Sequence, residues 1–250
     1  FAIQYGLSVG GRSKNYTIDN VTIDNFLIGV YGRGENMTIQ NSAISRVEAG
    51  VNIMGGRNLT ITDSSIVTEV TRNDKQLYAV RFGAENAPTT PAVLDFHVYN
   101  STLALNNPDG LVPTPGNYMR SVVLRGNAGG ELDIVNSNIP QGILNIASVP
   151  ITADGNWWGS ADKPVVDEDY VGLVNFCSWL DAPTPDGELL GDGMVTNQRT
   201  GHYYCSIQAA IDDAEAGDVL VASAGTFVEQ IVIDKAITLQ GPNFEKAGYA

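Results

Sequence analysis

The sequence predicts an all-β protein: a right-handed parallel β-helix, or solenoid, with one short capping α-helix near the C-terminus. Three segments, 15–23, 36–44 and 58–66, repeat one pattern in which apolar and polar side chains alternate. They begin 21 and then 22 residues apart. Alternation with a period of two is typical of strands, and a fixed period of this length indicates a coil of stacked parallel strands.

Two weaker copies, 96–103 and 132–139, extend the pattern, and a second strand recurs at 2–6, 49–53, 78–83 and 121–126. We expect one inward column of apolar side chains, formed by Ile18, Ile39, Ile61, Val98 and Ile134. The copies also share one turn position, occupied by Asn20, Asn41, Asp63, Asn100 and Asn136. Asn and Asp tolerate left-handed backbone, so a ladder of turn residues is expected along this corner.

Composition excludes some classes of partner. The 250 residues carry 14 basic and 28 acidic side chains, a net charge of −14, which disfavours a nucleic-acid partner. No run of 18 apolar residues is present, so no membrane span is expected. The chain opens at Phe1 inside a strand pattern and without a signal peptide, which suggests a processed or incomplete polypeptide.

Three regions are expected along the chain. Residues 1–158 form the β-helix turns, with protruding loops at 67–77, 83–91 and 106–119, and are closed by Trp157 and Trp158. Residues 159–205 are linker-like, and residues 206–250 form an opening turn with a helix after Ser206. Cys177 and Cys205 flank the Pro/Gly-rich connector, so they form either a disulfide or two free buried thiols, and a metal site is not expected.

Two segments resemble a known family. Asp154-Gly155-Asn156-Trp157-Trp158-Gly159 is similar to the closing motif of secreted bacterial right-handed β-helix repeat proteins, often called pectin-lyase-like. The segment from 207 to 242 resembles the opening turn of the same family, in which a helix caps the start. The resemblance implies an extracellular or cell-surface location, and it carries no catalytic residue onto this chain.

One outward patch departs from a plain polar surface. Aligned strands place Asp95, His97, Glu131 and Asp133 side by side, because neighbouring strands lie about 4.8 Å apart. Such a cluster can bind a cation such as calcium, the one cofactor considered, or supply an acid and a base. Arg81 and Arg125 are nearby basic candidates on the second strand. The alternative is an ordinary polar surface.

Two functions are therefore considered. The first is a non-enzymatic extracellular structural or surface repeat protein: an adhesin, a surface-layer component or a filament subunit. The second is a polysaccharide lyase, a glycoside hydrolase or a carbohydrate-binding module that uses the outward patch. An ice-binding surface is disfavoured because regular outward threonines stop after three turns.

The first function includes head-to-tail self-assembly into a homopolymer, in which residues 206–250 lie against the Phe1 end of another copy. The candidate assembly residues are Phe1, Ile3, Ile207, Ile211, Ile231, Ile233, Ile237 and Leu239. The rival interpretations are a fragment of a longer tandem protein and a chain that folds back on itself.

Overall fold

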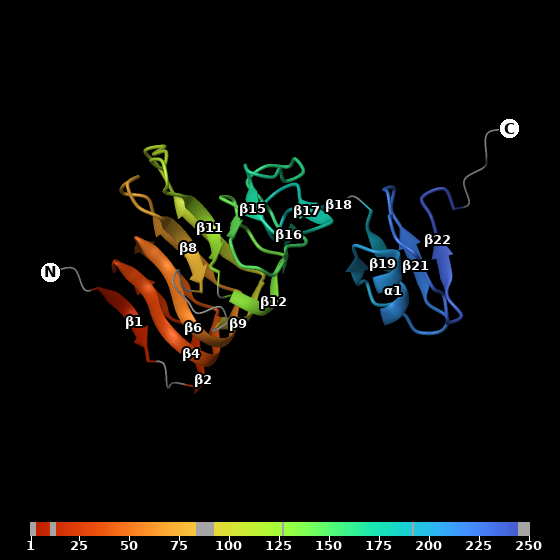
Figure 1. The fold of residues 1–250 in the computed structure, drawn as a ribbon, viewed down its shortest axis with the longest axis horizontal. Coiled ribbons are helices and arrows are strands. Elements are labelled where there is room, and N and C mark those ends of the chain that lie inside the picture. Colours follow the sequence, from red (N-terminus) through yellow and green to blue (C-terminus); the bar gives the residue numbers. More distant parts are fainter. Residues whose placement is uncertain (1–3, 11–13, 84–92, 127, 192, 245–250) are drawn as a thin grey trace. The chain divides into compact units, whose positions relative to one another are not determined.

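The computed structural model describes residues 4–10, 14–83, 93–126, 128–191 and 193–244 (Figure 1). The chain divides into two compact units. Unit 1 comprises Phe1–Asn175 and Leu180–Glu188, and unit 2 comprises Phe176–Trp179 and Leu189–Ala250. The region expected to be linker-like, 159–205, is thus shared between two folded units.

Most strands belong to unit 1. They are β1 (Tyr5–Val9), β2 (Lys14–Asp19), β3 (Thr22–Asp24), β4 (Ile28–Gln40), β5 (Ala43–Val47), β6 (Ala49–Thr62), β7 (Ser65–Glu69), β8 (Leu77–Phe82), β9 (Val93–Tyr99), β10 (Thr102–Asn106), β11 (Met119–Leu124), β12 (Ala128–Val135), β13 (Ile143–Asn145), β14 (Ile151–Thr152), β15 (Tyr170–Gly172) and β16 (Val174–Asn175). After them come β17 (Ser178–Leu180) and β18 (Leu189–Gly191), which form a two-stranded sheet.

The main sheet of unit 1 is a nearly closed parallel barrel, so the prediction of a right-handed β-helix solenoid is wrong. The sheet follows a nine-strand path, β15-β13-β11-β8-β6-β9-β12-β14-β16, and β4 joins it through β6. The repeat predicts two separate strands per turn. In the structure β4 and β6, with 13 and 14 residues, each run through both of these strand positions, and this explains the difference. The first part of β6 pairs with β8 and its second part with β9, which makes the sheet continuous.

Glycines allow these long strands to bend without leaving the sheet. Gly56 has φ 124°, and a Cβ atom built there would lie 1.7 Å from the carbonyl oxygen of Gly34 on the neighbouring strand. Only glycine fits such a close approach of two backbones. Gly34 and Gly56 are register partners in the β4–β6 pair, so the bend is repeated on adjacent strands.

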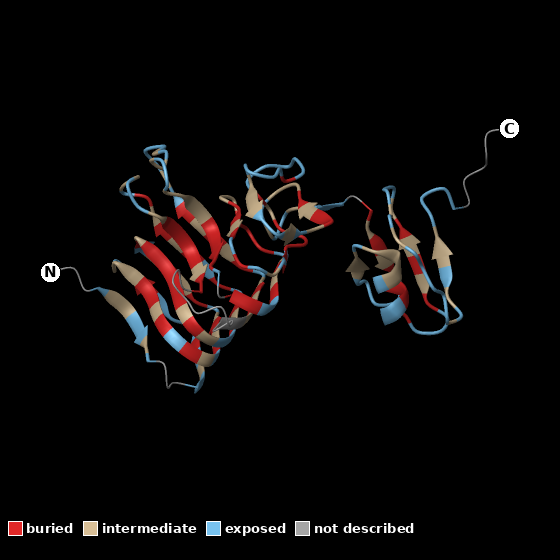
Figure 2. Cartoon of the chain, viewed as in Figure 1, coloured by how far each residue is buried: buried red, intermediate tan, exposed pale blue. Residues whose placement is uncertain are grey.

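The predicted inward column is confirmed. Ile18, Ile39, Ile61, Val98 and Ile134 are successive register partners, and each is at most 6% exposed. A second parallel sheet, β10-β7-β5-β3, supplies a similar column. Its buried members are Ile23, Ile44, Ile66 and Leu103. Figure 2 shows the resulting buried bands along the strands.

The predicted turn position is also left-handed in every copy. Its five residues, Asn20, Asn41, Asp63, Asn100 and Asn136, have φ between 48° and 53°. A different corner carries the ladder of amide side chains. There Asn36 Nδ2 donates to Asn15 Oδ1 (2.6 Å), and Asn58 Nδ2 donates to Asn36 Oδ1 (2.7 Å).

A buried serine ladder, which the sequence analysis missed, follows the first corner. The ladder consists of Ser42, Ser64, Ser101 and Ser137. Each hydroxyl accepts a hydrogen bond of 3.1 Å from the backbone N–H of the residue at the equivalent position on the preceding strand. Asn156 ends the series, because its Oδ1 accepts Ser137 N at 2.9 Å and its Nδ2 donates to Ile134 O at 2.7 Å. The asparagine of the Asn-Trp-Trp-Gly motif thus satisfies the last rung.

The tryptophans of that motif do not end the sheet. Trp158 is buried, and its ring lies 6.2 Å from that of Tyr170. Beyond it, β15 pairs with β13 and β16 pairs with β14, so a further layer of strands follows.

Unit 2 is small and mixed. It contains β19 (Val195–Asn197), β20 (Tyr203–Tyr204), α1 (Ile207–Asp213), β21 (Val219–Ala222) and β22 (Thr238–Gln240), with the sheet order β20-β19-β21-β22. Ser206 caps α1, as its side chain accepts the backbone N–H of Ala209 at 3.0 Å. Among the described residues, no helix is both long and apolar enough to cross a membrane.

We predict that the inward column controls the stability of unit 1. Ile39 is fully buried, so Ile39→Ala should lower the free energy of unfolding by about 2–5 kcal/mol. Thr38→Ala, one position away and facing outward, should change it by no more than about 0.5 kcal/mol. Urea unfolding of the two variants measures both values, and equal losses would contradict the inward assignment.

Candidate functional site

The predicted patch lies in one outward row of the main sheet. The register partners in this row are Thr17, Thr38, Thr60, His97, Asp133 and Thr152. His97 Nδ1 hydrogen-bonds to Asp133 Oδ1. The hydroxyl of Tyr99, two residues along β9, donates to Asp133 Oδ2 at 2.8 Å. Asp133 therefore holds both rings with its two oxygens.

The other two residues of the patch are placed differently. Asp95 has φ 59° and stands at the corner that Asn15, Asn36 and Asn58 occupy on earlier strands. Its Oδ1 accepts the backbone N–H of Glu131 at 2.9 Å. Asp95 thus stabilises a turn, whereas Glu131 is exposed. The structure brings His97 and Asp133 together and uses Asp95 to hold the backbone.

Tyr99 rigidifies this site as a hydrogen-bond donor. The pKa of Tyr99 is raised to about 12, mainly by burial and in addition by the hydrogen bond to the Asp133 carboxylate. Its ring is stacked on that of His97, with centroids 6.2 Å apart and planes 9° apart. The two side chains of the His97–Asp133 pair are 22% and 25% exposed, so the pair is only partly accessible to a ligand.

The two arginines do not join this site. Arg81 lies over the ring of Tyr78 and donates to Asn52 Oδ1 at 3.2 Å. Arg125 is buried and donates to Gln76 Oε1 at 2.6 Å. Arg81 lies on β8, which pairs with the first part of β6, whereas β9 pairs with the second part, so its guanidinium is not in register with the carboxylates.

Several oxygens of the patch already accept hydrogen bonds. Calcium takes six to eight oxygen ligands, many of them carboxylate oxygens. Both oxygens of Asp133 are hydrogen-bonded, to His97 and Tyr99, and one oxygen of Asp95 accepts a backbone amide. A bound cation would share these oxygens with the existing hydrogen bonds, and calcium binding at this patch stays a prediction.

The two cysteines form a disulfide within unit 2. Cys177 and Cys205 have Cα atoms 5.4 Å apart and are joined through their sulfurs. The bond ties the segment that enters unit 2 to the residue just before the helix cap Ser206. Of the two alternatives for these residues, the structure has the disulfide.

The candidate assembly residues fall into three groups. Phe1 and Ile3 lie outside the described residues. Ile211 is buried in the core of unit 2, and three others pack against that core: Ile207, Ile237 and Leu239. Ile231 and Ile233 are exposed, at 39% and 53%.

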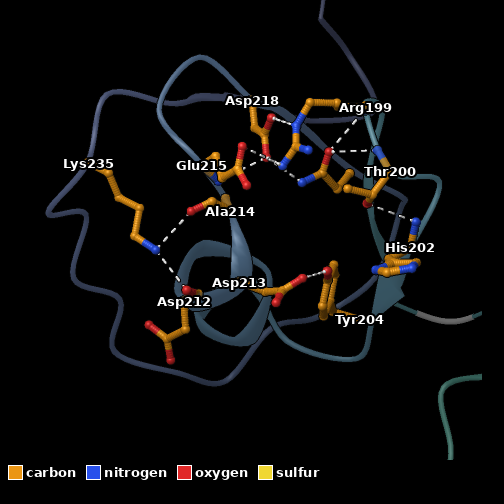
Figure 3. Close-up of polar contacts among 11 residues, drawn as sticks. Arg199, Thr200, His202, Tyr204, Asp212, Asp213, Ala214, Glu215, Asp218 and Lys235 are labelled. Atoms are coloured by element: carbon orange, nitrogen blue, oxygen red, sulfur yellow. Dashed lines mark hydrogen bonds and ion pairs between the residues drawn. The ribbon is translucent and has the colours of Figure 1, made fainter.

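A second polar cluster, in unit 2, was not found from the sequence (Figure 3). Arg199 Nε donates to Asp218 Oδ1 at 2.5 Å, and Asn197 Nδ2 donates to Asp218 Oδ2 at 2.7 Å. These bonds join β19 to the turn before β21. Lys235 Nζ donates to the carbonyls of Asp212 and Ala214 and so satisfies the C-terminal end of α1. The cluster joins β19, α1 and the turn before β21.

No protein-family model, curated protein or solved structure matches this chain. The resemblance stated above therefore rests on the sequence motifs alone.

We predict that the His97–Asp133 site does not cleave acidic polysaccharides. Cleavage beside a uronate needs a lysine or arginine that binds the substrate carboxylate, and the row neighbours of the pair are Thr60 and Thr152, which are uncharged. Polygalacturonate incubated with the protein should yield neither unsaturated product nor new reducing ends. Turnover that Asp133→Asn abolishes, while the exposed control Glu131→Gln retains it, would contradict this prediction.

We also predict an acid-sensitive contribution from Asp218 to unit 2. The hydrogen bond from Arg199 lowers the pKa of Asp218 below its usual 3.8. A lowered folded-state pKa stabilises the fold above the unfolded-state pKa, and this stabilisation disappears as the pH falls through and below that value. Thermal unfolding followed by the amide signals of α1 should show this loss in acid.

Asp218→Asn should lower the melting temperature of unit 2 at neutral pH. It should also make that melting temperature less dependent on pH in the acid range. Asp234→Asn is the matched control, because Asp234 is exposed. A wild-type-like acid profile in Asp218→Asn would show that other carboxylates cause the loss.

Proposed function

We propose that this chain is a non-enzymatic extracellular structural protein whose copies assemble head to tail. The observation that carries the proposal is an exposed apolar segment of unit 2, Ile231, Val232 and Ile233, which are 39%, 64% and 53% exposed. Three consecutive exposed β-branched residues are unusual on a monomer surface. We call them the apolar segment.

The backbone of this region is in no strand ladder. Among the described residues, 228–235 make no backbone–backbone hydrogen bond. The side chain of Gln208 bonds to both backbone groups of Val232, accepting from its N–H at 2.7 Å and donating to its carbonyl at 3.3 Å, and an added strand would replace these two bonds. The adjacent strand β22 is the last in its sheet, so its outer edge is open among the described residues. Open edges beside apolar side chains favour the addition of a strand from another chain.

A second copy offers a matching partner in β1. Among the described strands, β1 pairs with β4 alone, so its outer edge is also open. Leu7 at its centre is 37% exposed. Contact between β1 of one copy and the apolar segment of the next joins two different surfaces, and such a heterologous contact gives an open chain of copies.

One feature supports an extracellular setting, and a second predicts how assembly depends on salt. The Cys177–Cys205 disulfide is stable in oxidising compartments. The net charge of −14 makes copies repel one another, and salt weakens this repulsion. Assembly should therefore strengthen as ionic strength rises.

The test is sedimentation of the full chain at low salt and at about 1 M NaCl, where the Debye length is about 3 Å. We expect larger species at high salt. The double variant Ile231→Asp/Ile233→Asp should remain monomeric under the same conditions, and Leu7→Asp should weaken assembly from the other side.

Val112→Asp is the matched control, because Val112 is an apolar residue of unit 1 that is 73% exposed. It should assemble like the wild type. A wild-type chain that stays monomeric at high salt, or a control that loses assembly as the double variant does, would refute the proposal.

A further inference from the structure

A groove runs along the left-handed corner of unit 1, between the main sheet and the sheet β10-β7-β5-β3. Its floor is formed by the turn residues Asn20, Asn41, Asp63 and Asn100, with the hydroxyls of Thr22 and Ser65 beside them. Asn100 also lines a second pocket, together with Asn136, Leu180, Thr184 and Pro185. The two pockets share Asn100, and together we call them the corner groove.

From this geometry we propose that the corner groove binds an extended, uncharged polysaccharide chain. The inference is independent of self-assembly, because no residue that lines the groove belongs to the apolar segment or to β1.

The groove presents amide groups that are free to bind a ligand. Asn20, Asn100 and Asn136 are exposed, and their side chains make no hydrogen bond to any described residue. The asparagines of the other corner differ, since Asn36 and Asn58 bond along their own ladder. Each free amide offers two donors and one acceptor, which match the mixed donor and acceptor character of sugar hydroxyls.

The backbone that carries these amides is fixed. The backbone N–H of Asn20 donates to Gln40 O at 3.2 Å, and that of Asn100 donates to Val135 O at 3.2 Å. The turn positions recur once per strand, about 4.8 Å apart. Asn41 Nδ2 is bonded to Asp19 Oδ1, so the free amides on neighbouring strands are those of Asn100 and Asn136, at a spacing close to the length of one hexose unit.

The far end of the groove has an apolar wall. Leu180 and Pro185 line it, and Thr184 N donates to Asn138 Oδ1 at 2.8 Å, which fixes the wall to the sheet. A wall of this kind suits the C–H face of a sugar ring, while the amides suit its hydroxyls. Apolar surface with a few placed polar groups is typical of small-ligand sites.

Charge selects the class of polysaccharide. The groove contains the carboxylate of Asp63, and the chain carries a net charge of −14. Both disfavour uronates and sulfated sugars. The ligand class is therefore a neutral hexose polymer, which is bound and not cleaved.

The test is titration of the full chain with neutral α-linked and β-linked hexose oligosaccharides and with oligogalacturonate, followed by calorimetry and by the side-chain amide signals. We expect saturable binding of a neutral oligosaccharide and shifts of the Asn20, Asn100 and Asn136 amides. Asn100→Gly should weaken binding about tenfold, the effect of losing about 1.4 kcal/mol of hydrogen bonding.

Asn58→Gly is the matched control, because Asn58 has the same left-handed backbone and lies on the other corner. Glycine retains that backbone at both positions, so neither variant is expected to unfold. The control should bind like the wild type, and Pro185→Ala should weaken binding from the far wall.

Three results would overturn the inference: no saturable binding of any neutral oligosaccharide, equal weakening by Asn58→Gly and Asn100→Gly, or tighter binding of oligogalacturonate. The amide shifts of the wild type decide the question even where a variant is unstable. Asn100→Gly should leave sedimentation unchanged, and Ile231→Asp/Ile233→Asp should leave binding unchanged, so failure here and failure of the assembly proposal are distinguishable.

Discussion

The structure of unit 1 depends on the register between parallel neighbours. Ile39 must face Ile18 and Ile61, because a shift of one residue would turn every inward side chain outward. Left-handed residues recur at two positions in each repeat and help to fix that register, and the serine ladder satisfies the buried amides just after the second position. Core packing and turn geometry therefore specify the same alignment.

That constraint explains why the polar corners differ in function. At one corner the amides of Asn15, Asn36 and Asn58 bond to one another, so this corner serves stability. At the other corner, backbone hydrogen bonds and the buried serine ladder hold neighbouring strands in register. The exposed amides of Asn20, Asn100 and Asn136 make no hydrogen bond to a described residue, and they are the groups that we propose bind a ligand.

The residues of the outward patch also differ in their structural roles. Asp95 stands where its predecessors are ladder asparagines, and it keeps their structural role through the bond to Glu131 N. Asp133 then orients His97 and Tyr99. The aligned acidic residues thus have two roles: Asp95 is a turn residue, and Asp133 is a carboxylate that holds two rings. Neither has a lysine or arginine in its row.

The sequence by itself determined the repeat, the inward column, the left-handed turn position and the short helix after Ser206, because these follow from local periodicity and turn preference. It could not determine the closure of the sheet. Whether Gly32–Gly34 and Gly55–Gly56 end a strand or bend it depends on how closely the neighbouring backbone approaches, and only the tertiary structure sets that distance. The serine ladder, the Arg199–Asp218 contact and the corner groove likewise join residues 19 or more positions apart, so their geometry was decided by packing.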